Sequence, residues 1–421
     1  MPASTSVANA KGRFFYDGVA KPEFTVRRPE EEALLALVKA GRRIRLDGPR
    51  RCGKTTLVAN TLSRHDIEAL NIDLLGVTTL PKLMERVAEN AETFLATHPG
   101  TRDRLFGKNG LKFGGELSLL KLAKVTAETT SEQESKPGTS LDALLRIVSE
   151  VAKDAGAVVV VDEFQATRHP NMTNPVEVEG SFATASDPSR TKGKNSWLFL
   201  GSHRLAMHQI FSVPESAFAL RMETLPVGPI PQESIIPFLN KRSGRKVDAA
   251  VGEEAYRWTE GIPGDLQRLY SAMVELTSSP APLKLDELAA AQDLVMHEVG
   301  RISAPSLSGM ESDQPDQLRL LRLVASEDIR DVNQLAKVAD ANGIKPKAAG
   351  AALTGLVRSG ILHYDSEKGP QLERPEPILF HYLADAGARS YTVASALENA
   401  FRALPKPGPA PKAATSVSRT R

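Results

Sequence analysis

The sequence predicts an α/β protein with a three-layer fold built on a central parallel sheet. Three short segments have the length of strands, and each ends where polar residues begin. They are residues 43–47, 157–161 and 196–200. The second is an uninterrupted run of Ala and Val, which is typical of a strand buried on both faces of a parallel sheet. Residues 71–75 form a fourth candidate strand after a helical segment, as in a βαβ unit.

The first predicted strand leads into a phosphate-binding loop. Residues 48–55 read Gly-Pro-Arg-Arg-Cys-Gly-Lys-Thr, which matches Gly, any four residues, Gly, Lys and Ser or Thr. Glycine lets successive backbone amides point at a phosphate, and residues 56–63 continue as a helix whose positive end faces the anion. Lys54 can reach the β- and γ-phosphates, and the Thr55 hydroxyl can ligate Mg²⁺. The predicted nucleotide-binding residues of the loop are Gly48, Pro49, Arg50, Arg51, Cys52, Gly53, Lys54, Thr55 and Thr56.

Polar residues at the ends of the other two strands are candidates for catalysis. Asp162 and Glu163 follow the second strand. In a phosphate-loop enzyme Asp162 would hold Mg²⁺, and Glu163 would orient or deprotonate the attacking water. Ser202 follows the third strand, where a polar side chain can touch the γ-phosphate or that water. His203, the next residue, is predicted to be an exposed loop residue.

The order and the residues of these motifs resemble those of the archaeal-type ATPases, which lie between the AAA+ and STAND branches of the phosphate-loop NTPases. The more specific marks are Gly-Pro-Arg-Arg at 48–51 and Asp-Glu-Phe-Gln at 162–165, and Gly-Ser at 201–202 follows in the expected place. The resemblance covers most of residues 24–385. It implies binding of ATP with Mg²⁺, and hydrolysis of ATP to ADP and phosphate.

The resemblance also assigns residues beyond the central motifs. It implies that Arg221 contacts phosphate in the same or a neighbouring subunit, and that Pro263, in a Gly-x-Pro turn, belongs to the nucleotide site. Glu376 stands where the family usually has Asp in its closing segment. A second sensor arginine is missing from the pattern, since Arg268 has only a loose match in spacing.

The chain is predicted to contain several units. A small helical subdomain like the lid of AAA+ proteins and a C-terminal winged helix would follow the α/β domain. The boundaries are 1–23 for a flexible leader, 24–228 for the ATPase domain, 229–301 for the lid, 302–316 for a linker, 317–385 for the winged helix, 386–403 for a C-terminal helix, and 404–421 for a disordered basic tail. Residues 105–140 and 166–195 are longer than the family core requires.

The winged-helix prediction comes from three amphipathic helices followed by a hairpin. The helices are expected at 317–325, 332–340 and 346–359, and the hairpin would turn at 365–369. Four positive side chains could contact duplex DNA, namely Lys345, Lys347, Arg358 and Lys368. The third helix is otherwise rich in Ala and Gly, so a structural or protein-contact role stays open beside DNA binding.

Composition narrows the function classes. The chain has 421 residues and a formal charge of +2, which is too small to indicate nucleic acid by itself. Its single cysteine, Cys52, excludes a disulfide framework within one chain and argues against a structural zinc site. No apolar run approaches the roughly 20 residues that span a bilayer, and no signal core precedes Arg13. We therefore expect a soluble cytoplasmic protein without membrane contact.

Two functions fit the sequence. The first is an ATP-hydrolysing molecular switch of the AAA+/STAND kind, in which ATP binding closes the lid and orders an oligomer or partner surface. The alternative is a nucleotide-sensing protein-binding module with negligible turnover. A homo-oligomer or a protein partner is compatible with both functions.

Overall fold

The computed structural model describes residues 28–106, 137–191, 195–219, 221–243, 246–276, 282–364 and 369–388. A five-stranded sheet with the order β2-β3-β4-β1-β5 forms its centre, and every pairing in it is parallel. The strands are β1 Arg43–Asp47, β2 Ala69–Asp73, β3 Val158–Asp162, β4 Trp197–Leu200 and β5 Glu223–Pro226. The four predicted strands are confirmed, with β2 beginning two residues earlier than expected. No pattern predicted β5.

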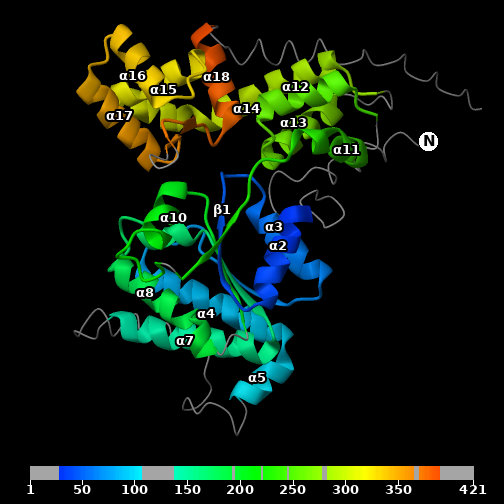
Figure 1. Ribbon diagram of the computed structural model, residues 1–421, viewed down its shortest axis with the longest axis vertical. Coiled ribbons are helices and arrows are strands. Elements are labelled where there is room, and N and C mark those ends of the chain that lie inside the picture. The colour runs from blue at the N-terminus through cyan, green and yellow to red at the C-terminus, as the bar shows by residue number, and fades with distance from the viewer. Residues whose placement is uncertain are drawn as a thin grey trace, which may run out of the picture.

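Helices cover both faces of this sheet and give the predicted three layers (Figure 1). One face carries α2 Arg28–Lys39 and α3 Lys54–Arg64. The other carries α4 Leu80–Thr97, α7 Pro137–Ala155, α8 Pro175–Ala185 and α10 Arg204–Phe211, with the shorter elements α5 Pro99–Phe106, η2 Phe164–Arg168 and α9 Pro188–Thr191 nearby. The extra residues at 166–191 therefore add helices to this second face. Most of 105–140 lies outside the described residues.

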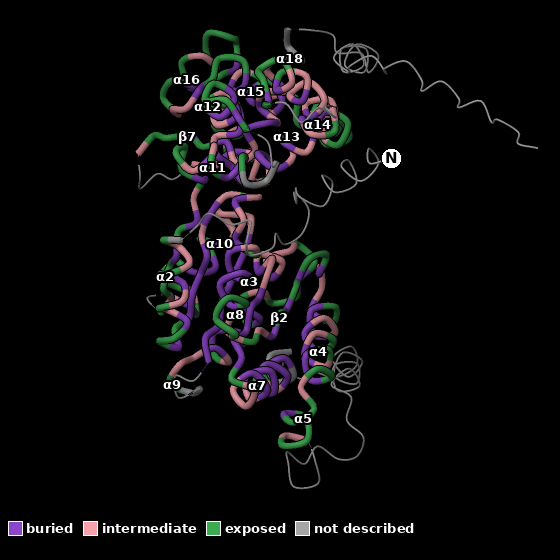
Figure 2. The backbone as a smooth tube through the Cα atoms, turned by 90° about the vertical axis from the view of Figure 1, so that its right-hand side faces the viewer, coloured by how far each residue is buried: buried purple, intermediate pink, exposed green. Residues whose placement is uncertain are grey.

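The alternation of side chains along β3 explains why both faces are apolar. Val158 and Val160 pack into the core beneath α2 and α3, whereas Val159 and Val161 pack into the core beneath α4 and α7. A strand buried on both sides reads as a continuous apolar run, as this one does. The three central strands, β1, β3 and β4, are buried along almost their whole length, and Figure 2 shows the middle of the sheet domain largely as buried. Truncating a larger buried side chain, such as Leu or Ile, to Ala typically lowers the free energy of unfolding by about 2–5 kcal/mol.

A helical unit follows the sheet domain. Its elements are α11 Gln232–Ser243, α12 Ala249–Thr259, α13 Pro263–Leu276 and α14 Leu285–Asp313. They share a core that includes Trp258, Leu269 and Val295. The helices predicted in 229–301 are therefore confirmed, and the unit lies above the carboxyl edge of the sheet (Figure 1).

The predicted linker at 302–316 is wrong. Helix α14 continues to Asp313 with Pro305 inside it, and the next helix begins at Pro315. A proline inside a helix removes one backbone hydrogen bond and normally breaks it. Here Leu307 and Met310 pack against the C-terminal core, so burial of apolar surface opposes the break. The Pro, Ser and Gly residues that suggested a linker are thus part of a helix joining two units.

The C-terminal unit contains the three helices that the sequence predicted. These are α15 Pro315–Ser326, α16 Val332–Ala341 and α17 Pro346–Arg358. A short antiparallel pair follows, β6 His363–Tyr364 with β7 Leu372–Glu373, and α18 Pro377–Ala388 packs on α14 and α15. The predicted hairpin turn, the leader, residues 389–403 and the tail at 404–421 lie wholly or mostly outside the described residues. In the described part of the chain, no helix is both long and apolar enough to cross a membrane.

Candidate nucleotide site

The phosphate-binding loop connects β1 to α3, as the motif predicts. Its second glycine, Gly53, adopts φ 85° immediately before α3 begins at Lys54. Gly48 is required for a different reason, because a Cβ atom there would lie 2.1 Å from the backbone oxygen of Val227 and 2.9 Å from Cys52 Sγ. Cys52 is fully buried and fills space between the loop and the sheet. These contacts explain the loop's tight curvature.

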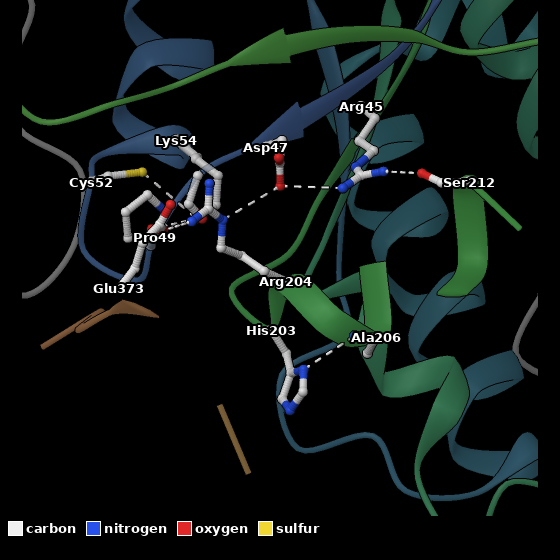
Figure 3. A network of polar contacts seen from close by, with 11 residues as sticks. Arg45, Asp47, Pro49, Cys52, Lys54, His203, Arg204, Ala206, Ser212 and Glu373 are labelled. Atoms are coloured by element: carbon white, nitrogen blue, oxygen red, sulfur yellow. Dashed lines mark hydrogen bonds and ion pairs between the residues drawn. The ribbon is translucent and has the colours of Figure 1, made fainter. Parts of the chain in front are cut away.

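Lys54 is bonded to its own loop. Its Nζ donates to the backbone oxygens of Gly48 at 2.9 Å and Pro49 at 2.8 Å, and Cys52 Sγ lies at 3.8 Å (Figure 3). The side chain is buried. An ammonium group has three donors, and a phosphate oxygen is a stronger acceptor for them than a neutral carbonyl. The loop thus presents a positive charge at the helix amino terminus, where an anion is favoured.

Thr55 and Asp162 meet at the carboxyl edge of the sheet. Thr55 Oγ1 donates to Asp162 Oδ2 at 2.7 Å, and Asp162 Oδ1 accepts from the backbone N–H of Glu163 at 2.8 Å. A hydroxyl and a carboxylate oxygen are hard ligands that suit Mg²⁺. Among the described residues, no group of three or more His, Cys, Asp or Glu side chains could hold a metal. Two protein oxygens still fit Mg²⁺, which usually binds one or two protein groups together with substrate phosphates and water.

Glu163 and Ser202 also lie together. Ser202 Oγ donates to Glu163 Oε2 at 3.1 Å, and Gln165 Nε2 donates both to that carboxylate and, at 3.3 Å, to Ser202 Oγ. Glu163 has φ 53°, a left-handed backbone that is strained for a residue with a side chain and that often marks functional sites. Gln165 belongs to the Asp-Glu-Phe-Gln motif, but the sequence analysis does not predict it as a site residue. Its position in Asp-Glu-Phe-Gln was the signal that could have found it.

The turn before α13 packs on the loop from above. Pro263 is buried at the start of α13, and the backbone N–H of Gly264 donates to the oxygen of Arg51 at 3.1 Å. Arg51 Nη1 reaches Asp265 Oδ1 at 3.3 Å. Burial raises the pKa of Asp265 to about 6, although the Arg51 charge acts in the opposite direction. Pro263 thus adjoins the loop, as the resemblance implies.

Arg221 does not reach the loop of its own chain. It lies two residues before β5, whose residue Glu223 pairs with Ile44 at the amino half of β1. In this register Arg221 is level with Arg42, which is six residues before Gly48. At about 3.3 Å per residue, Arg221 and Gly48 are therefore separated by about 20 Å along the strand direction. The same-subunit role is therefore wrong for this conformation, because parallel strands bring their amino ends to the opposite edge. A role in a neighbouring subunit stays a prediction.

His203 and Arg204 link this edge of the sheet to the C-terminal unit. The ring of His203 caps α10, where Nδ1 accepts from the N–H of Ala206 at 3.2 Å, and its Nε2 lies 2.6 Å from the oxygen of Arg358. Arg204 Nη1 pairs with the carboxylate of Glu373, and Arg204 Nε lies 4.0 Å from Asp47 Oδ1 (Figure 3). His203 was predicted to be an exposed loop residue, but it is half-buried between two units. Contacts between distant segments, which local sequence does not encode, determine this position.

Arg268, the loosely spaced candidate for a second sensor, faces another helix. Its Nε lies 3.9 Å from Glu298 Oε2 on α14, and its side chain is mostly buried. This contact orients Arg268 within the helical unit.

Comparisons with known proteins find similar solved structures but no match by sequence. No protein-family model and no curated protein matches the sequence. The Walker-type ATPase PABY2304 of Pyrococcus abyssi matches with a TM-score of 0.60 and 18% identity, covering 87% of this chain and 99% of that one. The Aeropyrum pernix ORC2 protein, in its ADPNP–ADP complexes, matches with a TM-score of 0.49 and 15% identity, covering 89% and 98%. The first likeness shows that the chain has the fold of a Walker-type ATPase.

Proposed function

We propose that this protein binds ATP with Mg²⁺ at the loop 48–55 and hydrolyses it to ADP and phosphate, acting as a molecular switch. The observation that carries the proposal is that a lysine and two pairs of polar side chains lie at one edge of the sheet. Lys54 lies in the loop, Thr55 touches Asp162, and Glu163 touches Ser202. Phosphoryl transfer to water commonly uses a phosphate-binding Lys, magnesium ligands and a group that orients water, and the ends of three strands offer candidates for these roles.

The chemistry assigns a role to each of these side chains. Lys54 would bind the terminal phosphates, and Thr55 with Asp162 would hold Mg²⁺, which supplies neutralisation of phosphate charge when bound. Glu163 would accept a proton from the attacking water, since its carboxylate already accepts hydrogen bonds at this place. Ser202 and Gln165 would orient that carboxylate and the water.

The alternative is a nucleotide-sensing protein-binding module with negligible turnover. It needs the loop and the magnesium ligands but not a base. The contacts of Glu163 with Ser202 and Gln165 favour hydrolysis, because they hold a carboxylate in one orientation beside the predicted phosphate position. A turnover rate separates the two functions.

The test is a measurement on the wild-type protein. Calorimetry should show ATP binding, and a phosphate-release assay should show turnover that stops when EDTA removes Mg²⁺. The physical reason is that removing Mg²⁺ takes away the positive charge that would neutralise the phosphates beside the carboxylate of Asp162. Absence of ATP binding would contradict the whole proposal, whereas binding without release would favour the sensing module.

We further propose that residues 317–385 form a winged helix whose positive side chains can touch duplex DNA. The three helices and the β6–β7 pair support the fold, and Lys345, Lys347 and Arg358 are exposed. The exposed positions between Lys347 and Arg358 on α17 are Gly350, Ala351 and Thr354, and only Thr354 has a side chain that could hydrogen-bond to a base edge. Any DNA binding should therefore be weak and largely independent of sequence.

This DNA prediction can be checked by titrating a labelled duplex at low and moderate salt. Binding at low salt should fall steeply as salt rises, because phosphate contacts release counterions. Replacing Lys345, Lys347 and Arg358 together by Ala should remove it. If the duplex does not bind at low salt, a protein-contact role for this unit is favoured instead.

A further inference from the structure

Arg51 joins the phosphate-binding loop to the two helical units above it. We propose that Arg51 is a positioning residue for the nucleotide site, which sets the loop against α13 and the C-terminal segment so that the loop can accept phosphate. The proposal rests on the proposed binding of ATP. Its basis is the set of partners that this one residue has in distant parts of the chain.

Three contacts place Arg51 at the junction. Its backbone oxygen accepts from the N–H of Gly264 at 3.1 Å, and its Nη1 lies 3.3 Å from Asp265 Oδ1. Its guanidinium is also 3.8 Å from Glu376 Oε2, and the neighbouring Arg50 is 3.2 Å from the same carboxyl group. Asp265 belongs to α13, and Glu376 immediately precedes α18. One residue of the loop therefore holds both units.

The fit between Gly264 and Arg51 is close. A Cβ atom at position 264 would lie 2.7 Å from Arg51 Cβ, which is closer than real Cβ contacts come. Gly264 lies within α13 and has helical backbone angles, so glycine is needed here to leave room for Arg51 and not for its conformational freedom. The first turn of this helix, residues 263–266, has no basic side chain of its own. Positive charge at this end of the helix thus comes from the loop.

The burial of Asp265 shows why its partner matters. Its side chain is 1% exposed, and Oδ2 has no hydrogen-bond partner among the described residues. A buried carboxylate is unfavourable unless a positive group pairs with it, and removing one partner leaves an uncompensated charge. Arg51 therefore stabilises α13 in this position through charge as well as through its backbone.

The backbone of Arg51 gives an independent reason to assign it a function. Its φ is 61°, a left-handed conformation that is unfavourable for a residue with a side chain. The side-chain contacts to Asp265 and Glu376 oppose relaxation of this conformation. If those contacts are lost, the loop is free to change shape, and its amides no longer converge on one place.

The experiment compares single and double variants. Arg51→Met should lower the melting temperature, because buried Asp265 loses its hydrogen-bonded cation and keeps only the charge of Arg268 nearby. It should also raise the Kd for ATP at least tenfold. Arg51→Met with Asp265→Asn removes the buried charge, so the melting temperature should recover. ATP affinity should nevertheless stay at least tenfold weaker than in the wild type, because the side-chain contacts of Arg51 with positions 265 and 376 are still absent.

Three further proteins make the result decisive. Arg51→Lys keeps a positive charge beside Asp265, but its ammonium lies one bond nearer the backbone than Arg51 Nη1, the atom that makes both carboxylate contacts. The longer contact with Glu376 should therefore be lost, so this variant should melt like the wild type and still bind ATP more weakly. Arg257→Met is the matched control, since Arg257 is exposed on α12 and pairs only along its own helix with Glu254 in the contacts described. It should change neither property.

Lys54→Ala distinguishes a failure of the proposed ATP binding from a failure of the proposed role of Arg51. If neither the wild type nor Lys54→Ala binds ATP, the proposed function fails. If the wild type binds ATP and Lys54→Ala does not, while the double variant and Arg51→Lys both bind ATP as tightly as the wild type, then Arg51 is only structural and the inference is overturned.

Discussion

Lys54→Ala is expected to abolish measurable ATP binding. The Lys54 ammonium is buried at the amino end of α3 and now bonds only to neutral or weakly polar atoms of its loop. Hydrogen bonds to charged groups contribute about 1.5–3 kcal/mol each, so losing two of them to phosphate weakens affinity by about 100-fold or more. Calorimetry with ATP and Mg²⁺ measures the effect directly.

A second readout guards against a folding artefact. ATP should raise the melting temperature of the wild type further as its concentration increases above the Kd, and it should leave that of Lys54→Ala unchanged. Lys153→Ala is a suitable control, because Lys153 forms a surface pair with Glu150 on α7, far from the loop. Unchanged ATP affinity in a folded Lys54→Ala protein would show that the loop does not bind nucleotide as proposed.

Glu163→Gln is expected to keep ATP bound while reducing turnover by about 10²- to 10⁴-fold, the usual contribution of a positioned general base. The amide has nearly the same shape as the carboxylate, so the contacts with Ser202 and Gln165 can largely persist. What the amide lacks is the ability to accept a proton from water. Phosphate release under single-turnover conditions, with ATP affinity measured in parallel, checks both halves of the prediction.

The matched control is Glu253→Gln, which neutralises an exposed carboxyl on α12 without touching the sheet edge. It should hydrolyse ATP at the wild-type rate. Equal rates for wild type and Glu163→Gln would remove Glu163 from the role of base. If both rates are also negligible, the sensing module becomes the better description.

Local patterns in the sequence were sufficient for the elements that carry the chemistry. The loop 48–55, the apolar run ending at Asp162 and the strand before Ser202 are each only a few residues long, so a short stretch of sequence was enough to predict each of them. Parallel strands bring their carboxyl ends to one edge, so the meeting of Thr55 with Asp162 and of Glu163 with Ser202 followed from those patterns.

Only the tertiary structure decided which distant residues meet around that edge. Arg51 contacts Asp265 and Glu376, and His203 contacts the oxygen of Arg358, across separations that no local pattern spans. The parallel pairing of β5 with β1, which no pattern predicted, placed Arg221 at the edge of the sheet opposite the loop.

Packing likewise decided the course of the chain between the two helical units. Residues 302–313 had the composition of a linker, yet they are helical because Leu307 and Met310 bury apolar surface that outweighs the cost of Pro305. The sequence by itself determined where the phosphate-loop motif and its acidic partners lie along the chain, since each motif spans only a few residues. The arrangement of the lid, the C-terminal unit and Arg51 above them depends on the free energy of contacts formed only in the folded chain.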